Sequence, residues 1–225
     1  MKAQEKSDIY DFLTLAQGWV EGRKIEANPP VFRDSPDPVP FCPTHRDFAE
    51  ALESCRRCED QSGKPHPGCG TFEPGALEVL VVSERPLNTD ESSPEYALLL
   101  KMLSAIALDP GTNCGITALI KCADSQESNT GRFGADGCAP WFESELRLIS
   151  PLAVLSLGDG AASLLAGSSE PGEMMFGRKT LWKGTPVIGT YHPADLLADP
   201  QLKRPAWEHL KTLKTILDSA GRRDF

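Results

Sequence analysis

Four short apolar runs mark the second two-thirds of the chain, and none of them alternates regularly with polar residues. They read LEVLVVS, GITALIK, LAVLSLG and PVIGTYH, over residues 77–83, 115–121, 152–158 and 186–192. Such runs are typical of strands covered on both faces. Helical patterns are predicted between and after them, over residues 95–108, 136–149, 159–166 and 206–220. This alternation predicts an α/β fold, a three-layer α/β/α sandwich around a central parallel four-stranded sheet.

The first part of the chain follows a different pattern. Residues 6–23 place apolar side chains at near-helical spacing, which predicts an amphipathic helix. Residues 28–43 read NPPVFRDSPDPVPFCP and are too rich in proline for regular structure. We therefore expect an N-terminal helix and Pro-rich linker over residues 1–45, followed by one domain over residues 46–225.

Polar or reactive residues follow each predicted strand: Glu84, Lys121 with Cys122, Gly158 with Asp159, and His192. Open parallel sheets bind their ligands outside the carboxyl ends of the strands. We therefore expect a carboxylate, a cysteine, a helix N-terminus and a histidine to converge on one edge of the sheet.

Composition narrows the class of protein. A chain of 225 residues that is 40% apolar is long enough to bury one sizeable core. It has no signal-like apolar run at its start and no stretch of 18 apolar residues, so we expect a soluble, cytoplasmic protein that does not enter membranes. We also expect it to be a monomer.

The charge of the chain limits how it could bind nucleic acid. A net charge of -9 argues against a general nucleic-acid coat, because phosphate binding needs clustered lysine and arginine. Residues 201–225 nevertheless contain six Lys or Arg against three Asp or Glu, which leaves room for a local basic rim.

Seven cysteines in a chain of this kind favour metal ligation over a disulfide scaffold. Cys55 and Cys58 form a CxxC pair, which supplies half of a metal site. The other half could come from Cys122 with Cys138, from Cys69, or from Cys42 with His66. One CxxC with two distant single cysteines fits a four-thiolate cluster better than a zinc ribbon, although a zinc-stabilised domain and a merely buried Cys122 remain alternatives.

Several segments resemble, in order, the family 4 uracil-DNA glycosylases. They are ITALIKC (116–122), CAPWFESEL from Cys138, ISPLAVLSLGDGAASLL (149–165) and TYHPADLLADPQLKRPAWEHLKTL (190–213). The last string is the most specific, because in that family a histidine-proline pair ends a strand and a leucine-containing loop meets the DNA. The resemblance covers about residues 50 to 220 and implies the same fold.

The resemblance also implies a cofactor and a set of site residues. It selects Cys55, Cys58, Cys122 and Cys138 as ligands of a [4Fe-4S] cluster. The implied catalytic residues are Glu84, Asp90 and His192, with the histidine donating to the base oxygen and one of the carboxylates orienting water. The implied DNA- and substrate-binding residues are Ser83, Pro86, Pro193, the wedge leucines Leu196 and Leu197, and the phosphate contacts Lys203 and Arg204.

The chain departs from this family at three places. The first-strand loop SERPLNTDE has Ser83 and Leu87 where the family has glycine. The following stretch offers only Tyr96 as an aromatic, where the family has a Phe that stacks on uracil. The asparagine that reads the base is replaced by Ala118, and Thr117 beside it should face the other side of the sheet.

Two hypotheses follow. The first is a DNA repair glycosylase that acts on uracil or on another deaminated or damaged base. The second is a non-excising iron–sulfur relative that binds nucleic acid or a partner protein. Glu84 and His192 favour the first hypothesis, whereas Ala118 and Leu87 favour the second.

Overall fold

A five-stranded sheet in the order β2-β1-β3-β5-β4 forms the centre of the computed structural model. The structure describes residues 39, 42–55, 77–90, 92–122, 133–166 and 176–221, so the predicted helix over residues 6–23 lies outside the described residues. The strands are β1 (Val79–Ser83), β2 (Cys114–Ala118), β3 (Ala153–Leu157), β4 (Lys179–Trp182) and β5 (Thr185–Thr190). The predicted α/β fold is confirmed, and its four predicted strands run parallel to one another.

The predicted strand count needs one correction, because β4 adds an antiparallel strand beside β5. Its four residues, KTLW, alternate between exposed and half-buried, so they lack the continuous apolar run that marks the buried strands. A two-residue turn joins β4 to β5, with Lys183 at φ +46° and Gly184 at φ +92°. Positive φ at both positions matches the tight turns that fit twisted hairpins.

Seven helical segments surround the sheet in the described part of the chain. They are α2 (His45–Glu53), α3 (Pro94–Ser104), α4 (Phe133–Ile149), α5 (Gly158–Ala166), α6 (Pro193–Ala198), the 3-10 turn η2 (Pro200–Leu202) and α7 (Lys203–Ser219). The four predicted helices correspond to α3, α4, α5 and α7, whereas α2, α6 and η2 were not predicted. None of the described helices combines the length and the apolar character that a membrane crossing requires.

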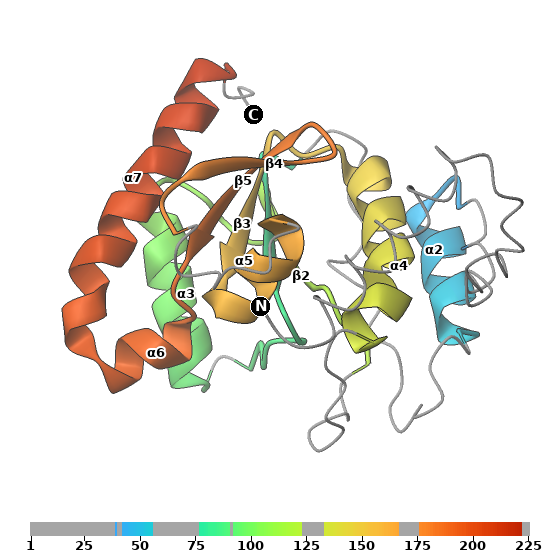
Figure 1. The fold of residues 1–225 in the computed structure, drawn as a ribbon, viewed down its shortest axis with the longest axis horizontal. Helices are drawn as coiled ribbons and strands as arrows, with labels where there is room; N and C mark the ends of the chain where they lie inside the picture. The colour runs from blue at the N-terminus through green and yellow to red at the C-terminus, as the bar shows by residue number, and fades with distance from the viewer. Residues whose placement is uncertain are drawn as a thin grey trace, which may run out of the picture. The chain divides into compact units, whose positions relative to one another are not determined.

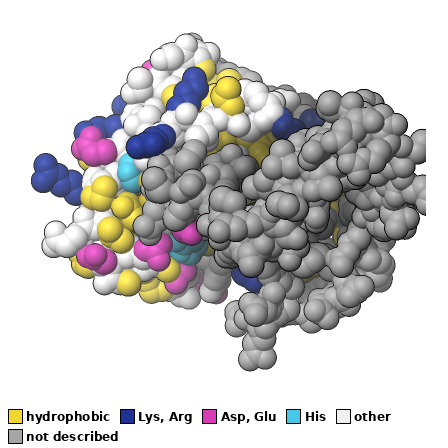
Figure 2. Space-filling model, viewed as in Figure 1, with side chains coloured by type: hydrophobic (Ala, Val, Ile, Leu, Met, Phe, Trp, Pro, Cys, Tyr) yellow, Lys and Arg dark blue, Asp and Glu magenta, His cyan; other side chains and the backbone are white. Residues whose placement is uncertain are grey.

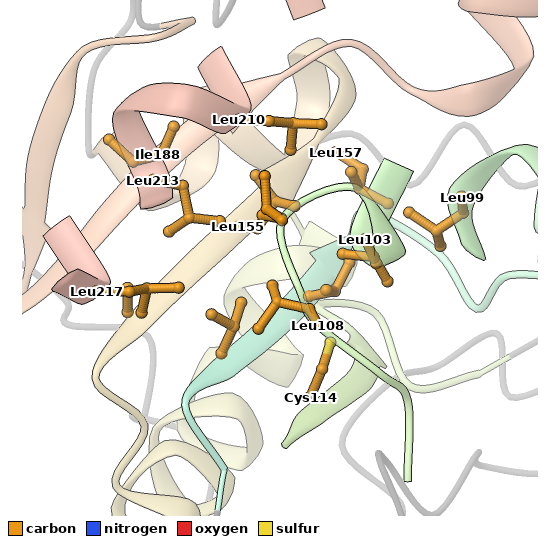
Figure 3. Packing of buried hydrophobic residues seen from close by; sticks show 14 residues of the cluster. Leu99, Leu103, Leu108, Cys114, Leu155, Leu157, Ile188, Leu210, Leu213 and Leu217 are labelled. Carbon is orange, nitrogen blue, oxygen red and sulfur yellow. The ribbon is translucent and has the colours of Figure 1, made fainter. Parts of the chain in front are cut away.

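Successive residues of β1 divide the core into two layers. Val79 and Val81 face a cluster that includes side chains of α3 and α7, whereas Leu80 and Val82 face a cluster that includes side chains of α4 and α5. Figure 3 shows the first cluster, with leucines of α3 and α7 converging on β3 and β5. In Figure 1 these two helices lie on one side of the sheet and α4 lies on the other. The three-layer sandwich is thereby confirmed.

A smaller third cluster joins α2 to α4. Phe48 meets Trp141 edge-to-face with 5.6 Å between ring centroids, and Leu52 and Cys42 are buried beside them. A capping box between Thr44 and the helix's third residue fixes the start of α2. This cluster positions the end of α2, and therefore Cys55, against α4.

Candidate active site

The candidate site lies where three neighbouring parallel strands end. In the sheet β3 lies between β1 and β5, and α5 begins directly after β3. Glu84 follows β1 and His192 follows β5 by two residues. The two side chains therefore approach the N-terminus of α5 from opposite sides, as expected from the strand ends.

Glu84 is held against the first turn of α5. A β-carbon added to Gly160 would collide with the Glu84 carboxylate, so this carboxylate lies directly over the glycine. The backbone N–H of Ile120 donates to the Glu84 carbonyl oxygen at 2.9 Å and fixes the main chain. A helix N-terminus favours acidic side chains nearby, so this position suits a carboxylate.

His192 lies on the other side of the same turn. Gly158 has φ +82°, and an added β-carbon there would lie 3.3 Å from the His192 β-carbon. The backbone conformation and the close histidine both favour glycine at this position. Two glycines of one helical turn thus make room for the two candidate catalytic side chains.

Hydrogen bonds fix the orientation of the His192 ring. Its Nδ1 accepts from the backbone N–H of Ala194 at 3.2 Å, and its backbone N–H donates to the Asp195 carboxylate at 3.2 Å. His192 is therefore the N-cap of α6. Because Nδ1 accepts, the neutral imidazole carries its proton on Nε2, which can donate to a ligand.

The loop after β1 is held by a hydrogen bond within the loop and by packing against the core. Ser83 is buried, and its hydroxyl donates to the Arg85 carbonyl at 2.5 Å. Pro86 is half-buried, and Leu87 packs against the α3–α7 core cluster. Leu87, at a family glycine position, thus anchors the loop to the core.

Asp90 occupies an exposed turn before α3. Its carboxylate accepts from the backbone N–H of Ser92 at 2.8 Å and from the Ser92 hydroxyl at 2.7 Å. These two bonds lower the pKa of Asp90. Among the described residues Asp90 forms no hydrogen bond or ion pair with Glu84 or His192, so two of the three predicted catalytic residues, Glu84 and His192, lie against the same turn of α5.

The position of the family's base-reading asparagine is apolar here. Ala118 is buried at the end of β2 and pairs with Ser83. The Thr117 hydroxyl donates to Glu145 of α4 at 2.9 Å, which confirms that it faces the opposite side of the sheet. Tyr96 packs against the α3–α7 core cluster.

A buried ion pair links the end of β2 to α4 and was not predicted from the sequence. Lys121 Nζ lies 2.5 Å from Glu145 Oε2 and 2.7 Å from Thr117 Oγ1, and both charged side chains are at most 2% exposed. Lys121 was expected at the ligand-binding edge, but it points into the protein instead. A lysine within the apolar string ITALIKC was the signal available in the sequence.

The segment after His192 separates the two predicted wedge leucines. Leu196 is 1% exposed and belongs to the protein interior, whereas Leu197 is 43% exposed. Pro193 is buried at the first position of α6. Lys203 and Arg204 are exposed at the start of α7.

His209 of α7 supports the strand that carries the site, and the sequence analysis missed it. Its Nδ1 lies 3.1 Å from the Thr190 hydroxyl, and its ring stacks on Tyr191 with 5.7 Å between centroids. Burial lowers the pKa of His209, an effect that Glu208 partly opposes. A second histidine thus contacts the two residues directly before His192.

Of the four predicted cluster ligands, two are close to one helix face. The Trp141 indole N–H donates to Cys55 Sγ at 3.3 Å, and buried Cys138 precedes Trp141 by one helical turn. Cys122 is half-buried next to Lys121, and Cys58 lies outside the described residues. Among the described residues no three His, Cys, Asp or Glu side chains gather as metal ligands.

The other cysteines differ in their surroundings. Cys114 is fully buried in the core, and burial raises the pKa of its thiol to about 12. Burial, and secondarily Asp47, raises the pKa of Cys42. Both shifts disfavour the thiolate that metal binding requires. Cys69 and His66 lie outside the described residues.

A cavity of about 390 Å³ lies away from these residues. It is lined by side chains of the α4 C-terminus and the β4–β5 turn, among them Arg147, Trp182 and Lys183. Since β5 begins at Thr185, this cavity marks the opposite edge of the sheet.

Comparisons with known proteins agree with the fold. The family model of the uracil DNA glycosylase superfamily matches residues 69–211. A type-4 uracil-DNA glycosylase of Sulfurisphaera tokodaii is 24% identical over 183 residues, covering 74% of this chain and 82% of that protein. A type-4 uracil-DNA glycosylase of Archaeoglobus fulgidus is 25% identical over 193 residues, covering 79% of this chain and 94% of that protein. Because the family model spans more than half of the sequence, the chain belongs to the uracil DNA glycosylase superfamily.

Proposed function

We propose that this protein is a DNA glycosylase that hydrolyses the N-glycosidic bond of uracil or of another deaminated or damaged base in DNA. Membership of the superfamily supports this reaction. The observation that carries the proposal is the approach of Glu84 and His192 to the same turn of α5 from opposite sides. An enzyme of this class extrudes the target nucleotide, stabilises the departing base and supplies water to the sugar.

In this mechanism His192 stabilises the departing base. Negative charge develops on a base oxygen as the bond to the sugar breaks, and the Nε2–H of His192 donates to that oxygen. The bond from Ala194 to Nδ1 fixes the tautomer in advance, so the donor needs no reorganisation during the reaction. A fixed donor of this kind is worth about 3 kcal/mol of transition-state stabilisation.

Glu84 acts on the sugar side. Its carboxylate orients the attacking water and balances the positive charge of an oxocarbenium-like sugar. The first turn of α5 restrains this carboxylate through its contact with Gly160. Asp90 is a second candidate for the same role, because it is an exposed carboxylate on the same loop.

This protein selects its base through other contacts than the base-reading asparagine of the resembled family. Ala118 offers no group that hydrogen-bonds a Watson–Crick edge, and a polar reader is what normally gives steep discrimination. We therefore infer a pocket that accepts more than one deaminated base. Ser83 and Pro86 shape the loop at its wall, and Pro193 fixes the backbone next to His192.

The DNA meets the segment after His192. Leu197 is the exposed leucine and acts as the wedge that holds the duplex open. Lys203 and Arg204 bind phosphates beside it. The glycosylase domain occupies residues 46–225 and follows an N-terminal extension over residues 1–45.

We further propose that Cys55, Cys58, Cys122 and Cys138 hold a [4Fe-4S] cluster. The support is the contact of Trp141 with Cys55, because Trp141 lies one turn from Cys138 on α4. The Lys121–Glu145 ion pair ties the chain next to Cys122 to the same helix. When bound, the cluster would cross-link these segments as a structural element, and thiolates are its usual ligands.

An excision assay tests the proposed activity. Single-stranded and duplex oligonucleotides carrying uracil, hypoxanthine or xanthine are incubated with wild-type protein and with His192→Ala, and alkali-labile sites are measured. We expect wild type to release at least one of these bases and the variant to be slower by about 100-fold or more. Absence of release from every substrate would refute the proposal.

A further inference from the structure

Large apolar side chains are rarely exposed in the described part of the chain. Three of them stand out there, namely Leu181, Leu197 and Trp207, with exposed fractions of 62%, 43% and 41%. Leu181 lies on β4, whereas Leu197 and Trp207 lie within the α6–α7 segment that follows His192. The candidate site is thus followed by two solvent-facing apolar side chains.

Helix α7 does not need Trp207 for its packing. The helix buries its other face through Ala206, Leu210, Leu213 and Leu217. Trp207 is not among the buried residues of the helix, and 41% of its surface is accessible, so part of the indole is open to a ligand.

Positive charge surrounds this indole. Lys203 and Arg204 precede Trp207 by four and three residues, and Lys211 follows it by four, so all three neighbour it on the helix surface. Lys211 forms an ion pair with Glu208 at 2.6 Å, which leaves the first two cations as the main positive charges beside the ring. Figure 2 shows Lys and Arg side chains among hydrophobic ones on the side of the molecule where α7 lies.

We propose that Trp207 is a stacking platform for an unpaired base of a DNA strand, with Lys203 and Arg204 holding the phosphates of that strand. This inference rests on the proposed function, because it assigns the surface to the same DNA. An aromatic ring beside cations is the usual combination for single-stranded nucleic acid, since every base presents a π-face. Paired bases inside a duplex are already stacked, so the indole selects a splayed or single strand.

The charge of the whole chain strengthens this assignment. A net charge of -9 repels DNA from most of the surface, so attraction must be concentrated where cations cluster. The start of α7 meets this requirement, and only the short turn η2 separates it from α6, which carries exposed Leu197. Together α6 and the start of α7 form a binding surface for the DNA strand next to an extruded nucleotide.

Binding measurements without a damaged base test the inference. Fluorescence anisotropy gives the Kd of a labelled undamaged single strand, and of its duplex, for wild type, Trp207→Ala, Trp207→Phe and Leu181→Ala. We expect Trp207→Ala to weaken single-strand binding about ten-fold, and Trp207→Phe to retain most of the affinity. Leu181→Ala removes an apolar side chain of greater exposure from β4 and should bind like wild type.

The salt dependence of the same Kd tests the two cations. Lys203→Ala and Arg204→Ala should each reduce the slope of log affinity against log salt by about 0.7 for a single strand. Circular dichroism checks that all variants are folded. Equal single-strand affinity of wild type and Trp207→Ala, or an equal loss for single strand and duplex, would overturn the inference.

Failure of the inference and failure of the proposed activity give different results. If no base is excised but Trp207→Ala still selectively weakens single-strand binding, the inference stands and the glycosylase proposal falls. If excision proceeds while single-strand binding does not depend on Trp207, the glycosylase proposal stands and the inference about Trp207 falls.

Discussion

The Glu84 carboxylate lies over the α-carbon of Gly160, so the first turn of α5 acts as a stop for the side chain that follows β1. The contact joins the ends of two neighbouring strands, because β1 and β3 pair in parallel and α5 begins after β3. It therefore makes the position of Glu84 dependent on a residue with no functional group of its own.

The substitution Gly160→Ala should inactivate the protein without unfolding it. Its new methyl group would displace the carboxylate, and a misplacement of about 1 Å can cost about 100-fold in rate. Alanine is also a better helix former than glycine by about 1 kcal/mol, which offsets part of the strain. Single-turnover excision and thermal unfolding measure the two effects separately.

A double-mutant cycle provides the control for this prediction. If the loss acts through Glu84, Gly160→Ala should cause little further loss of rate in a Glu84→Gln background. Additive losses in the double variant would show that the glycine acts by another route.

The Lys121–Glu145 pair should be important for folding. Lys121→Met leaves the Glu145 charge buried without its cation, which should lower the free energy of unfolding by about 3–5 kcal/mol. Lys121→Met combined with Glu145→Leu should recover much of this loss, because two apolar groups replace two charges. Urea denaturation measures both variants, and equal stability of wild type and Lys121→Met would contradict the prediction.

His209 should make stability depend on pH. Because its pKa is lowered in the folded protein, the unfolded chain takes up a proton first as the pH falls through about 6.5. The free energy of unfolding should therefore decrease below that pH, and less so in His209→Gln. Urea titrations about one pH unit above and below 6.5 test this, and identical pH dependence in both proteins would count against it.

The proposed cluster separates the cysteines into two groups. Cys55→Ser should abolish broad absorption near 400 nm and stoichiometric iron and sulfide in anaerobically purified protein, whereas Cys114→Ala should retain them. Cys114 serves as a control because its buried thiol, with a pKa of about 12, does not form a thiolate at neutral pH. Zinc in place of iron in wild-type protein would instead favour a zinc-stabilised domain.

The sequence predicted the buried part of the fold better than its surface. Continuous apolar runs identified β1, β2, β3 and β5, because strands covered on both faces need no polar alternation. Strand β4 was not predicted by this criterion, because its half-exposed KTLW sequence has no continuous apolar run. Short α6 was hidden for a similar reason, because six residues are too few to show a helical period.

The candidate site was predicted as a set of strand ends, and its details came from contacts between distant residues. The rule for parallel sheets predicts that residues after β1 and β5 lie at one edge, and Glu84 and His192 both lie against the first turn of α5. It could not foresee that Lys121 turns inward, because this depends on Glu145, 24 residues away. The same holds for His209, which reaches β5 from the last helix of the chain.

The most direct test of the central claim compares three carboxylate and imidazole variants on one substrate. Single-turnover release is measured for wild type, Glu84→Gln, His192→Ala and Asp90→Asn, on whichever of the three damaged bases wild type releases fastest. We predict losses of about 100-fold or more for Glu84→Gln and His192→Ala, and a smaller loss for Asp90→Asn. Near-wild-type release by either Glu84→Gln or His192→Ala would contradict a site built across the first turn of α5.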